Sequence, residues 1–235
     1  MKKSLMKSHI ESHSRAGASF KEFILGGQDG LVNVLGVILG IAVATNDARL
    51  VIIAGLAAAF AESFSMAAVA YTSAKAEEDY YQSQKEKELD EIKTIPKMET
   101  QEVYDIYSKK GFQGKLLNDI VKTITSNKKM WLDTMMKEEL NLSDEFINPI
   151  KSAIIVGLAA IVGSIIPLIP FFFTNINTAI IYSIIISAIA LFITGAIEAK
   201  ITVGHWIKKG IQLTLIGMGA ALIGFVIGKW LGVSV

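Results

Sequence analysis

Residues 56–95 read LAAAFAESFSMAAVAYTSAKAEEDYYQSQKEKELDEIKTI, and this stretch decides the fold. It contains neither glycine nor proline, so nothing in it is obliged to break a helix. Forty residues of α-helix extend about 60 Å, whereas the hydrocarbon core of a bilayer is about 30 Å thick. Because the first half is small and apolar and the second half is charged, we expect one helix that crosses a membrane and continues into water.

Two pairs of candidate ligands lie on this predicted helix. Glu62 and Met66 are four residues apart in the apolar half, and Glu88 and Glu91 are three residues apart in the charged half. Side chains at either spacing share one face of a helix. The 22 residues from Met66 to Glu88 correspond to about 33 Å along the axis. We therefore expect one site inside the membrane and a second site on the water side.

The composition favours a membrane protein. The 235 residues are 51% hydrophobic and 19% charged, and the mean hydropathy is +0.45. The net charge of +1 does not indicate a nucleic-acid partner, and none is expected. The absence of cysteine excludes disulfides, thiolate metal sites and cysteine nucleophiles. The basic N-terminal stretch lacks the apolar core of a signal peptide.

Five apolar segments are long enough to cross a bilayer, at residues 23–44, 50–73, 149–173, 179–199 and 211–231. They predict an all-α membrane protein of five transmembrane helices, with a three-helix cytoplasmic domain inserted between the second and third spans. The expected domains are an N-terminal arm (1–22), transmembrane helices 1–2 (23–73), a metal-binding helical domain (74–148) and transmembrane helices 3–5 (149–235). Pro167 and Pro170 are expected to kink or break the third span, either beside a transport path or as a matter of plain packing.

Helix breakers divide the insert. Pro96, Gly111 and Gly114 separate three predicted helices: the extension of the second span to Ile95, then residues 98–110, then residues 113–140. Residues 141–144 are expected to form a turn in which Ser143 caps the next helix.

The charges of the loops predict the orientation in the membrane. The opposite turns carry only Arg49, whereas the N-terminal arm and the loop between the fourth and fifth spans are basic, with Lys2, Lys3, Lys7, Arg15, Lys21, Lys200, Lys208 and Lys209. The positive-inside rule therefore places the N-terminus and the insert in the cytoplasm and the C-terminus outside.

Two acids within the apolar spans are candidate functional residues. Asp29 and Glu62 are costly in a bilayer, so each is expected either to bind a cation or proton or to form a structural cap or hydrogen bond. Asn33 lies one turn after Asp29 as a second oxygen donor or a packing residue, and Met66 alone would be a core or lipid-facing residue. Carboxylates with a thioether suit divalent first-row ions such as Fe²⁺ better than Mg²⁺ or Ca²⁺.

The acids of the insert have two interpretations. They are either a solvated helix face or a cluster of carboxylates for metal capture, and periodicity alone cannot show that they converge. The pairs that permit a cluster are Glu88/Glu91, Glu99/Glu102 and Met135/Glu139. Separately, the GxxxG pairs Gly36/Gly40 and Gly224/Gly228 indicate close helix packing or dimerisation.

Several motifs together resemble the vacuolar iron transporter family of divalent-metal/proton antiporters. They are GGQDGLVNVLGVILG (26–40), AESFSMAAVAYTSAKAEEDYY (61–81), WLDTMMKEELNL (131–142), PLIPFFF (167–173) and GAALIGFVIG (219–228). The resemblance covers nearly the whole chain. It implies a homodimer of five-span subunits whose transport path lies near the subunit interface.

The resemblance also implies roles for individual residues. Asp29 and Met66 match the translocation aspartate and methionine of the family, while Glu88, Glu91, Glu99, Glu102, Met135 and Glu139 match its cytoplasmic metal-binding set. One departure concerns the second span, where some members carry a glutamate at the position of Ala58 and this chain has Glu62 one turn later. A second is Val69-Ala70-Tyr71, where many prokaryotic members read GEY.

The sequence therefore predicts an exporter of Fe²⁺, with Mn²⁺ as an alternative cargo, driven by inward proton flow. Asp29, Asn33, Glu62 and Met66 would form the pathway, and iron bound to the insert would also regulate it. The host is expected to be the plasma membrane in a prokaryote or the vacuolar membrane in a eukaryote. The alternative is a membrane-anchored metal sensor or store without transport. An enzyme is not expected, because the chain has no HExxH, no GxSxG and no cysteine.

Overall fold

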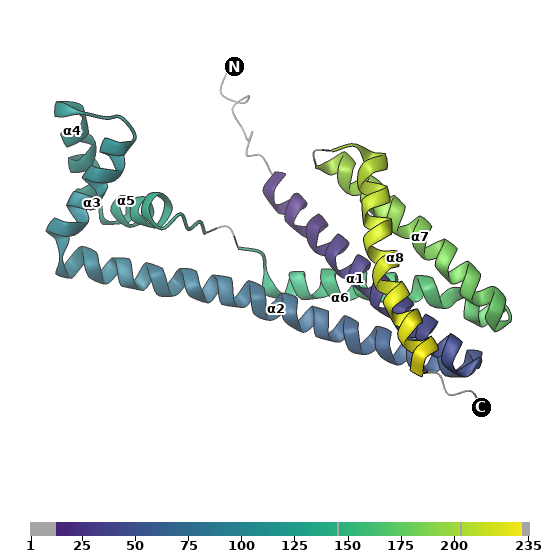
Figure 1. Cartoon of the computed structure of the whole chain (residues 1–235). Helices are drawn as coiled ribbons and strands as arrows, with labels where there is room; N and C mark the ends of the chain where they lie inside the picture. The colour runs from purple at the N-terminus through teal and green to yellow at the C-terminus, as the bar shows by residue number, and fades with distance from the viewer. Residues whose placement is uncertain (1–12, 145, 203, 232–235) are drawn as a thin grey trace, which may run out of the picture. The chain divides into compact units, whose positions relative to one another are not determined.

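The computed structural model describes residues 13–144, 146–202 and 204–231, and these residues are helical apart from short connections (Figure 1). The helices are α1 (His13–Thr45), α2 (Ala48–Thr94), α3 (Pro96–Lys109), α4 (Gly114–Thr125), α5 (Lys128–Thr134), the π-helix η1 (Met135–Glu139), α6 (Pro149–Phe173), α7 (Ile176–Ile201) and α8 (Trp206–Leu231). Residues 1–12 of the predicted N-terminal arm lie outside the described residues.

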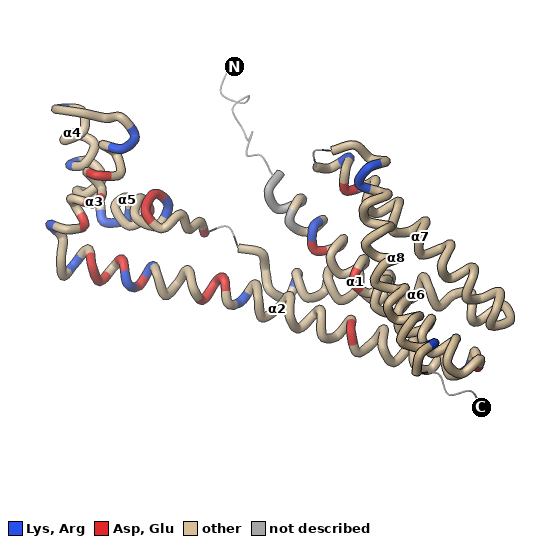
Figure 2. Tube along the Cα trace, in the orientation of Figure 1, with Lys and Arg blue, Asp and Glu red and all other residues tan. Residues whose placement is uncertain are grey.

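Five of the described helices, α1, α2, α6, α7 and α8, are long and apolar enough to cross a membrane. Shorter helices lie between the second and the third of them, so the predicted fold class is confirmed. The chain divides into two compact units. We call residues 1–72 with 147–235 the membrane unit and residues 73–146 the insert unit. Charged residues are concentrated in the insert unit (Figure 2).

In the membrane unit, α1 packs closely against α6. A Cβ atom added to Gly26 or Gly30 of α1 would collide with the backbone carbonyl of Val156 or Ala160 in α6. Gly163 of α6 is in turn pressed against the backbone of α1. Such small residues allow membrane helices to approach until their backbones touch.

The two GxxxG pairs pack against each other within the chain. Gly36 and Gly40 of α1 face Gly224 and Gly228 of α8, and a Cβ atom on Gly40 would lie 2.9 Å from the carbonyl oxygen of Gly224. The first of the two expected roles, close helix packing, is therefore the one that these glycines serve in the structure.

A break in the third span, one of the two expected effects of its prolines, is wrong, because α6 continues through Pro167 and Pro170. Membrane helices tolerate internal prolines where neighbouring helices and side chains compensate for the disturbed backbone. Pro167 is buried, and its carbonyl oxygen accepts a hydrogen bond of 2.7 Å from Ser183 Oγ of α7.

The predicted third helix of the insert, residues 113–140, is also wrong as one element. A turn at Ser126 and Asn127 separates α4 from α5, and η1 follows α5 directly. The side chain of Asn127 accepts hydrogen bonds from the backbone nitrogens of Lys129 and Met130, which starts a new helix. Ser143 does not cap α6, because Asn148 accepts from the backbone nitrogens of Ile150 and Lys151 instead.

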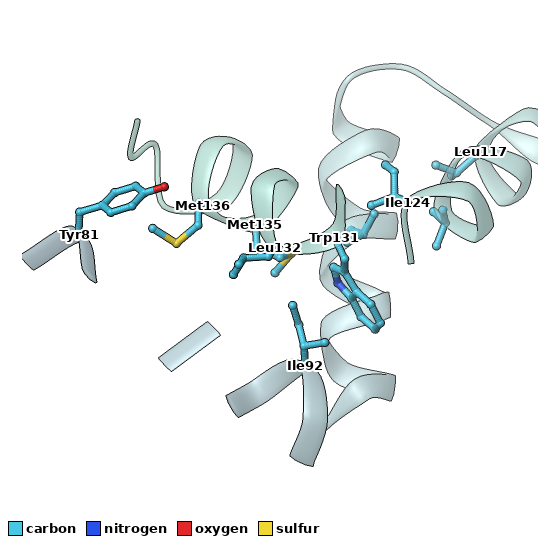
Figure 3. Close-up of a cluster of buried hydrophobic side chains, with 10 residues drawn as sticks. Tyr81, Ile92, Leu117, Ile124, Trp131, Leu132, Met135 and Met136 are labelled. Carbon is cyan, nitrogen blue, oxygen red and sulfur yellow. The ribbon is translucent and has the colours of Figure 1, made fainter. Parts of the chain in front are cut away.

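The insert unit has its own apolar core. Trp131, Leu132, Met135 and Met136 of α5 and η1 are buried together with Ile92 of α2, as Figure 3 shows. The core continues to Leu117 and Ile124 of α4. These contacts fix the helices that carry the acids of the insert.

Candidate metal pathway and carboxylate cluster

Within the membrane unit, α1 and α2 bring the predicted polar residues together. Asn33 Nδ2 donates a hydrogen bond of 2.5 Å to Glu62 Oε1. The carboxyl group of Glu62 also lies close to that of Asp29, which is one turn before Asn33 in α1. Two neighbouring carboxyl groups repel each other when both are ionised, so this arrangement can hold a proton or a cation.

The remaining pathway candidate is Met66. It follows Glu62 by one helical turn in α2, and both side chains are partly buried. Asp29 also lines a cavity of about 140 Å³ between α1 and α8, together with Gln28 and Gly217. Asp29 thus lies among helices and beside open space, which is where an acid of a membrane span can serve a cation or proton.

In the insert unit, two glutamates are buried without complete hydrogen bonding. Glu88 of α2 and Glu99 of α3 are each 3% exposed. The Oε2 atom of each has no hydrogen-bond partner. Burying an ionised carboxylate is costly unless a cation, a proton or hydrogen-bond donors compensate it. The two side chains therefore have unused capacity for a proton or a positive ion.

Five acids of the insert lie close enough to influence one another's charge. Burial, followed by the charges of Glu102, Glu88, Glu91 and Glu139, raises the pKa of Glu99 to about 7. Partial burial, followed by the charges of Glu102 and Glu88, raises the pKa of Glu139 to about 7. Burial and then Glu91 and Glu102 raise the pKa of Glu88. Such mutual repulsion is strong only over short distances.

The sixth predicted member, Met135, is fully buried in the apolar core (Figure 3). It begins η1, a type of helix that often occurs at functional sites, and Glu139 ends it. Among the residues that the structure describes, no three His, Cys, Asp or Glu side chains are arranged to hold a metal ion. The five acids are therefore neighbours that are not arranged around a common point.

One functional carboxylate of the membrane unit was not predicted from the sequence. Glu22 Oε1 of α1 accepts a hydrogen bond from Ser152 Oγ of α6, while Glu22 Oε2 is buried without a partner. Its spacing of seven residues from Asp29, which places both on one face of α1, was the available signal.

The chain is similar to known proteins over almost its whole length. The model of the VIT family matches residues 20–229. Vacuolar iron transporter 1 of Tulipa gesneriana is 32% identical over 227 residues, which cover 96% of this chain and 92% of the relative. Vacuolar iron transporter 1 of Arabidopsis thaliana is 30% identical over 230 residues, covering 97% and 92%. The vacuolar iron transporter of Plasmodium falciparum (isolate 3D7) is 30% identical over 234 residues, covering 95% and 86%.

Proposed function

Because the chain belongs to the VIT family, we propose that it carries Fe²⁺ out of the cytoplasm in exchange for protons. Membership of the family confirms the resemblance noted from the sequence, and the chain is a multi-pass membrane transporter rather than an enzyme. Mn²⁺ is a second candidate cargo, because carboxylate ligands suit it as well.

The observation that carries this proposal is the meeting of Asp29, Asn33 and Glu62 within the membrane unit. We propose that the two carboxyl groups alternate between holding a proton and binding the metal, with the Met66 thioether as a further ligand. Metal and proton compete for the same oxygens, which couples their opposite movements. Asn33 was expected as an oxygen donor, but its amide nitrogen supports Glu62, so we assign it to positioning that carboxylate.

We further propose that two copies of the chain form a homodimer around this pathway. In the single chain, the side chain of Asn33 is exposed and that of Glu62 is only partly buried. Ionisable side chains in a membrane span face protein or a water-filled space rather than lipid. A second copy would provide such a space and would supply further ligands for a dehydrated ion.

For the insert unit, we propose capture of cytoplasmic metal before transport. The buried oxygens of Glu88 and Glu99 and the raised pKa values around them support this role, because a divalent cation would relieve the repulsion. The metal-binding set would be Glu88, Glu91, Glu99, Glu102, Met135 and Glu139. Iron bound there would also regulate transport.

The test is metal uptake into proteoliposomes under an imposed pH gradient, with Fe²⁺ under anaerobic conditions and Mn²⁺ in parallel. We expect gradient-dependent metal movement with proton movement in the opposite direction. Asp29→Asn and Met66→Ala should abolish or strongly reduce it, whereas Met130→Ala, at an exposed methionine of the insert, should not. Tight metal binding without any flux would instead favour a membrane-anchored sensor or store.

A further inference from the structure

Glu22 is a carboxylate of the membrane unit that the proposed pathway does not yet use. One of its oxygens is held by Ser152 of α6, and the other is buried without a partner. Ser152 itself is only 3% exposed. The bond lies at the start of the seam in which Gly26 and Gly30 of α1 press against the backbone of α6. When the Glu22 carboxylate is ionised, its unpaired oxygen in this tight seam is costly unless a proton or a cation compensates the charge.

The position of Glu22 connects it with the pathway acids. Seven residues separate Glu22 from Asp29, so the two side chains point within about 20° of each other and lie about 10 Å apart along α1. Glu22 lies towards the end of α1 that the loop charges assign to the cytoplasm. It is therefore two helical turns from Asp29 on the same face, in the direction from which cytoplasmic water approaches.

The surroundings of Glu22 suit a proton better than a divalent cation. A divalent ion draws on about four to eight ligands, and Ser152 is the single hydrogen-bond partner of Glu22 among the described side chains. Lys21 and Lys151 flank Glu22 and Ser152 in sequence and are exposed, and their charges disfavour a second cation.

We propose that Glu22 is a proton-carrying carboxylate that links the Asp29–Glu62 pair to the cytoplasm. This proposal rests on the antiport function proposed above. A proton leaves the Asp29–Glu62 pair for a water molecule, passes to the Glu22 carboxylate and then leaves for cytoplasmic water. Only O–H bonds form and break, and Glu22 returns to its initial state. The gap of about 10 Å along the helix requires water as the intermediate carrier.

The test compares three variants of the full-length protein in proteoliposomes: Glu22→Gln, Ser152→Ala and Asp29→Asn. Glutamine keeps an acceptor for Ser152 but cannot carry a proton, whereas alanine at position 152 removes the hydrogen bond and keeps the acid. Two assays are run on each variant. One measures Mn²⁺ uptake with the accompanying proton flux, and the other measures exchange of Mn²⁺ for radiolabelled Mn²⁺ at equal pH, which needs no net proton movement.

We expect Glu22→Gln to reduce proton-coupled uptake by about tenfold or more and to leave metal exchange within about twofold of the parent. Ser152→Ala should reduce coupled uptake by less than Glu22→Gln does. Coupled uptake at the parent rate in Glu22→Gln would overturn the proposal. Equal loss in both assays, or greater damage from Ser152→Ala, would also overturn it by identifying the bond as a structural tie between α1 and α6.

The Asp29→Asn variant separates this inference from the function on which it rests. If Asp29→Asn abolishes coupled uptake while Glu22→Gln has no effect, the pathway is correct and the role of Glu22 is wrong. If Asp29→Asn transports metal like the parent, the proposed pathway is wrong, and the proposed role of Glu22 is then wrong as well.

Discussion

Asn33 of α1 and Glu62 of α2 are joined by a hydrogen bond of 2.5 Å between the amide nitrogen and a carboxylate oxygen. The bond turns one oxygen of Glu62 towards α1, where Asp29 is its second neighbour. Three residues that are dispersed over two helices therefore act as one polar group inside an apolar unit. A variant of Asn33 that lacks the amide would remove this hydrogen-bond donor from Glu62.

Replacing Asn33 by leucine, which is similar in size but has no donor, should lower metal transport about tenfold, since a hydrogen bond to a charged group contributes about 1.5–3 kcal/mol. Asn33→Asp should be more harmful, because it adds a third carboxylate to the group. Proteoliposome uptake measures both effects, with Val37→Leu, one turn further along α1 and exposed, as the control. Parental rates in both variants would show that Glu62 needs no support from α1.

The insert unit should become less stable as the pH rises when metal is removed. The folded pKa of Glu99 is about 7 against an ordinary value of 4.5, so the folded state retains a proton that the unfolded state has already released. The free energy of unfolding therefore falls between pH 4.5 and 7, by at most about 1.4 kcal/mol per pH unit for this group. Hydrogen exchange of residues 73–146 in the chelated full-length protein measures this change.

At pH 8 in chelator, Glu99→Gln should stabilise the insert unit by about 1–3 kcal/mol, because it removes a buried charge. The matched control is Glu77→Gln, at an exposed acid of α2, which should have little effect. The same Glu99→Gln change should weaken Mn²⁺ binding to the full-length protein. Protection that increases with pH in the parent would contradict the burial of ionisable oxygens in this cluster.

Contact between the backbones of α1 and α8 makes Gly224 sensitive to substitution. A side chain at this position would collide with the backbone of Gly36, so Gly224→Leu should destabilise the protein by about 1–3 kcal/mol. Gly219→Leu is the control in the same helix, since its added Cβ atom meets nothing within 4 Å. Thermal unfolding in detergent compares the two variants, and equal melting temperatures would refute the close contact.

Asn127 is expected to fix the start of α5 and, through it, the position of η1. Asn127→Ala removes both hydrogen bonds of its side chain to the backbone and should destabilise the insert unit by about 1 kcal/mol. Asn118→Ala, at an exposed position of α4, is the control. Local hydrogen exchange at residues 128–134 should increase in the first variant alone.

The sequence was sufficient for those parts of the fold that depend on local composition. Long apolar runs gave the five spans, and Pro96 and Gly114 marked the starts of α3 and α4. The break before α5 was missed because Ser126 and Asn127 are not strong helix breakers, although Asn127 is a good cap. The continuity of α6 through Pro167 was missed because its compensating neighbours come from other helices.

The sites depended more on contacts between distant residues. Helical spacing placed Asp29 beside Asn33 and Glu62 beside Met66, but the bond between Asn33 and Glu62 joins positions 29 residues apart. Which faces of α1 and α2 meet is set by packing, which no single sequence displays. The same holds for the acids of the insert, whose proximity follows from the fold of α2, α3 and η1 and not from their periodicity.

The glycine contacts of α1 have a mechanical consequence. Where a carbonyl group of one helix occupies the place of a missing Cβ atom on the other, sliding would drive one backbone into the other. We therefore expect α1, α6 and α8 to move as a single rigid block. At Gly55, the membrane-spanning part of α2 meets that block through the side chains of Leu168 and Ile38, which can change rotamer. We therefore expect α2 to tilt against the rigid block of α1, α6 and α8. This movement would open the Asp29–Glu62 pair first to one side of the bilayer and then to the other.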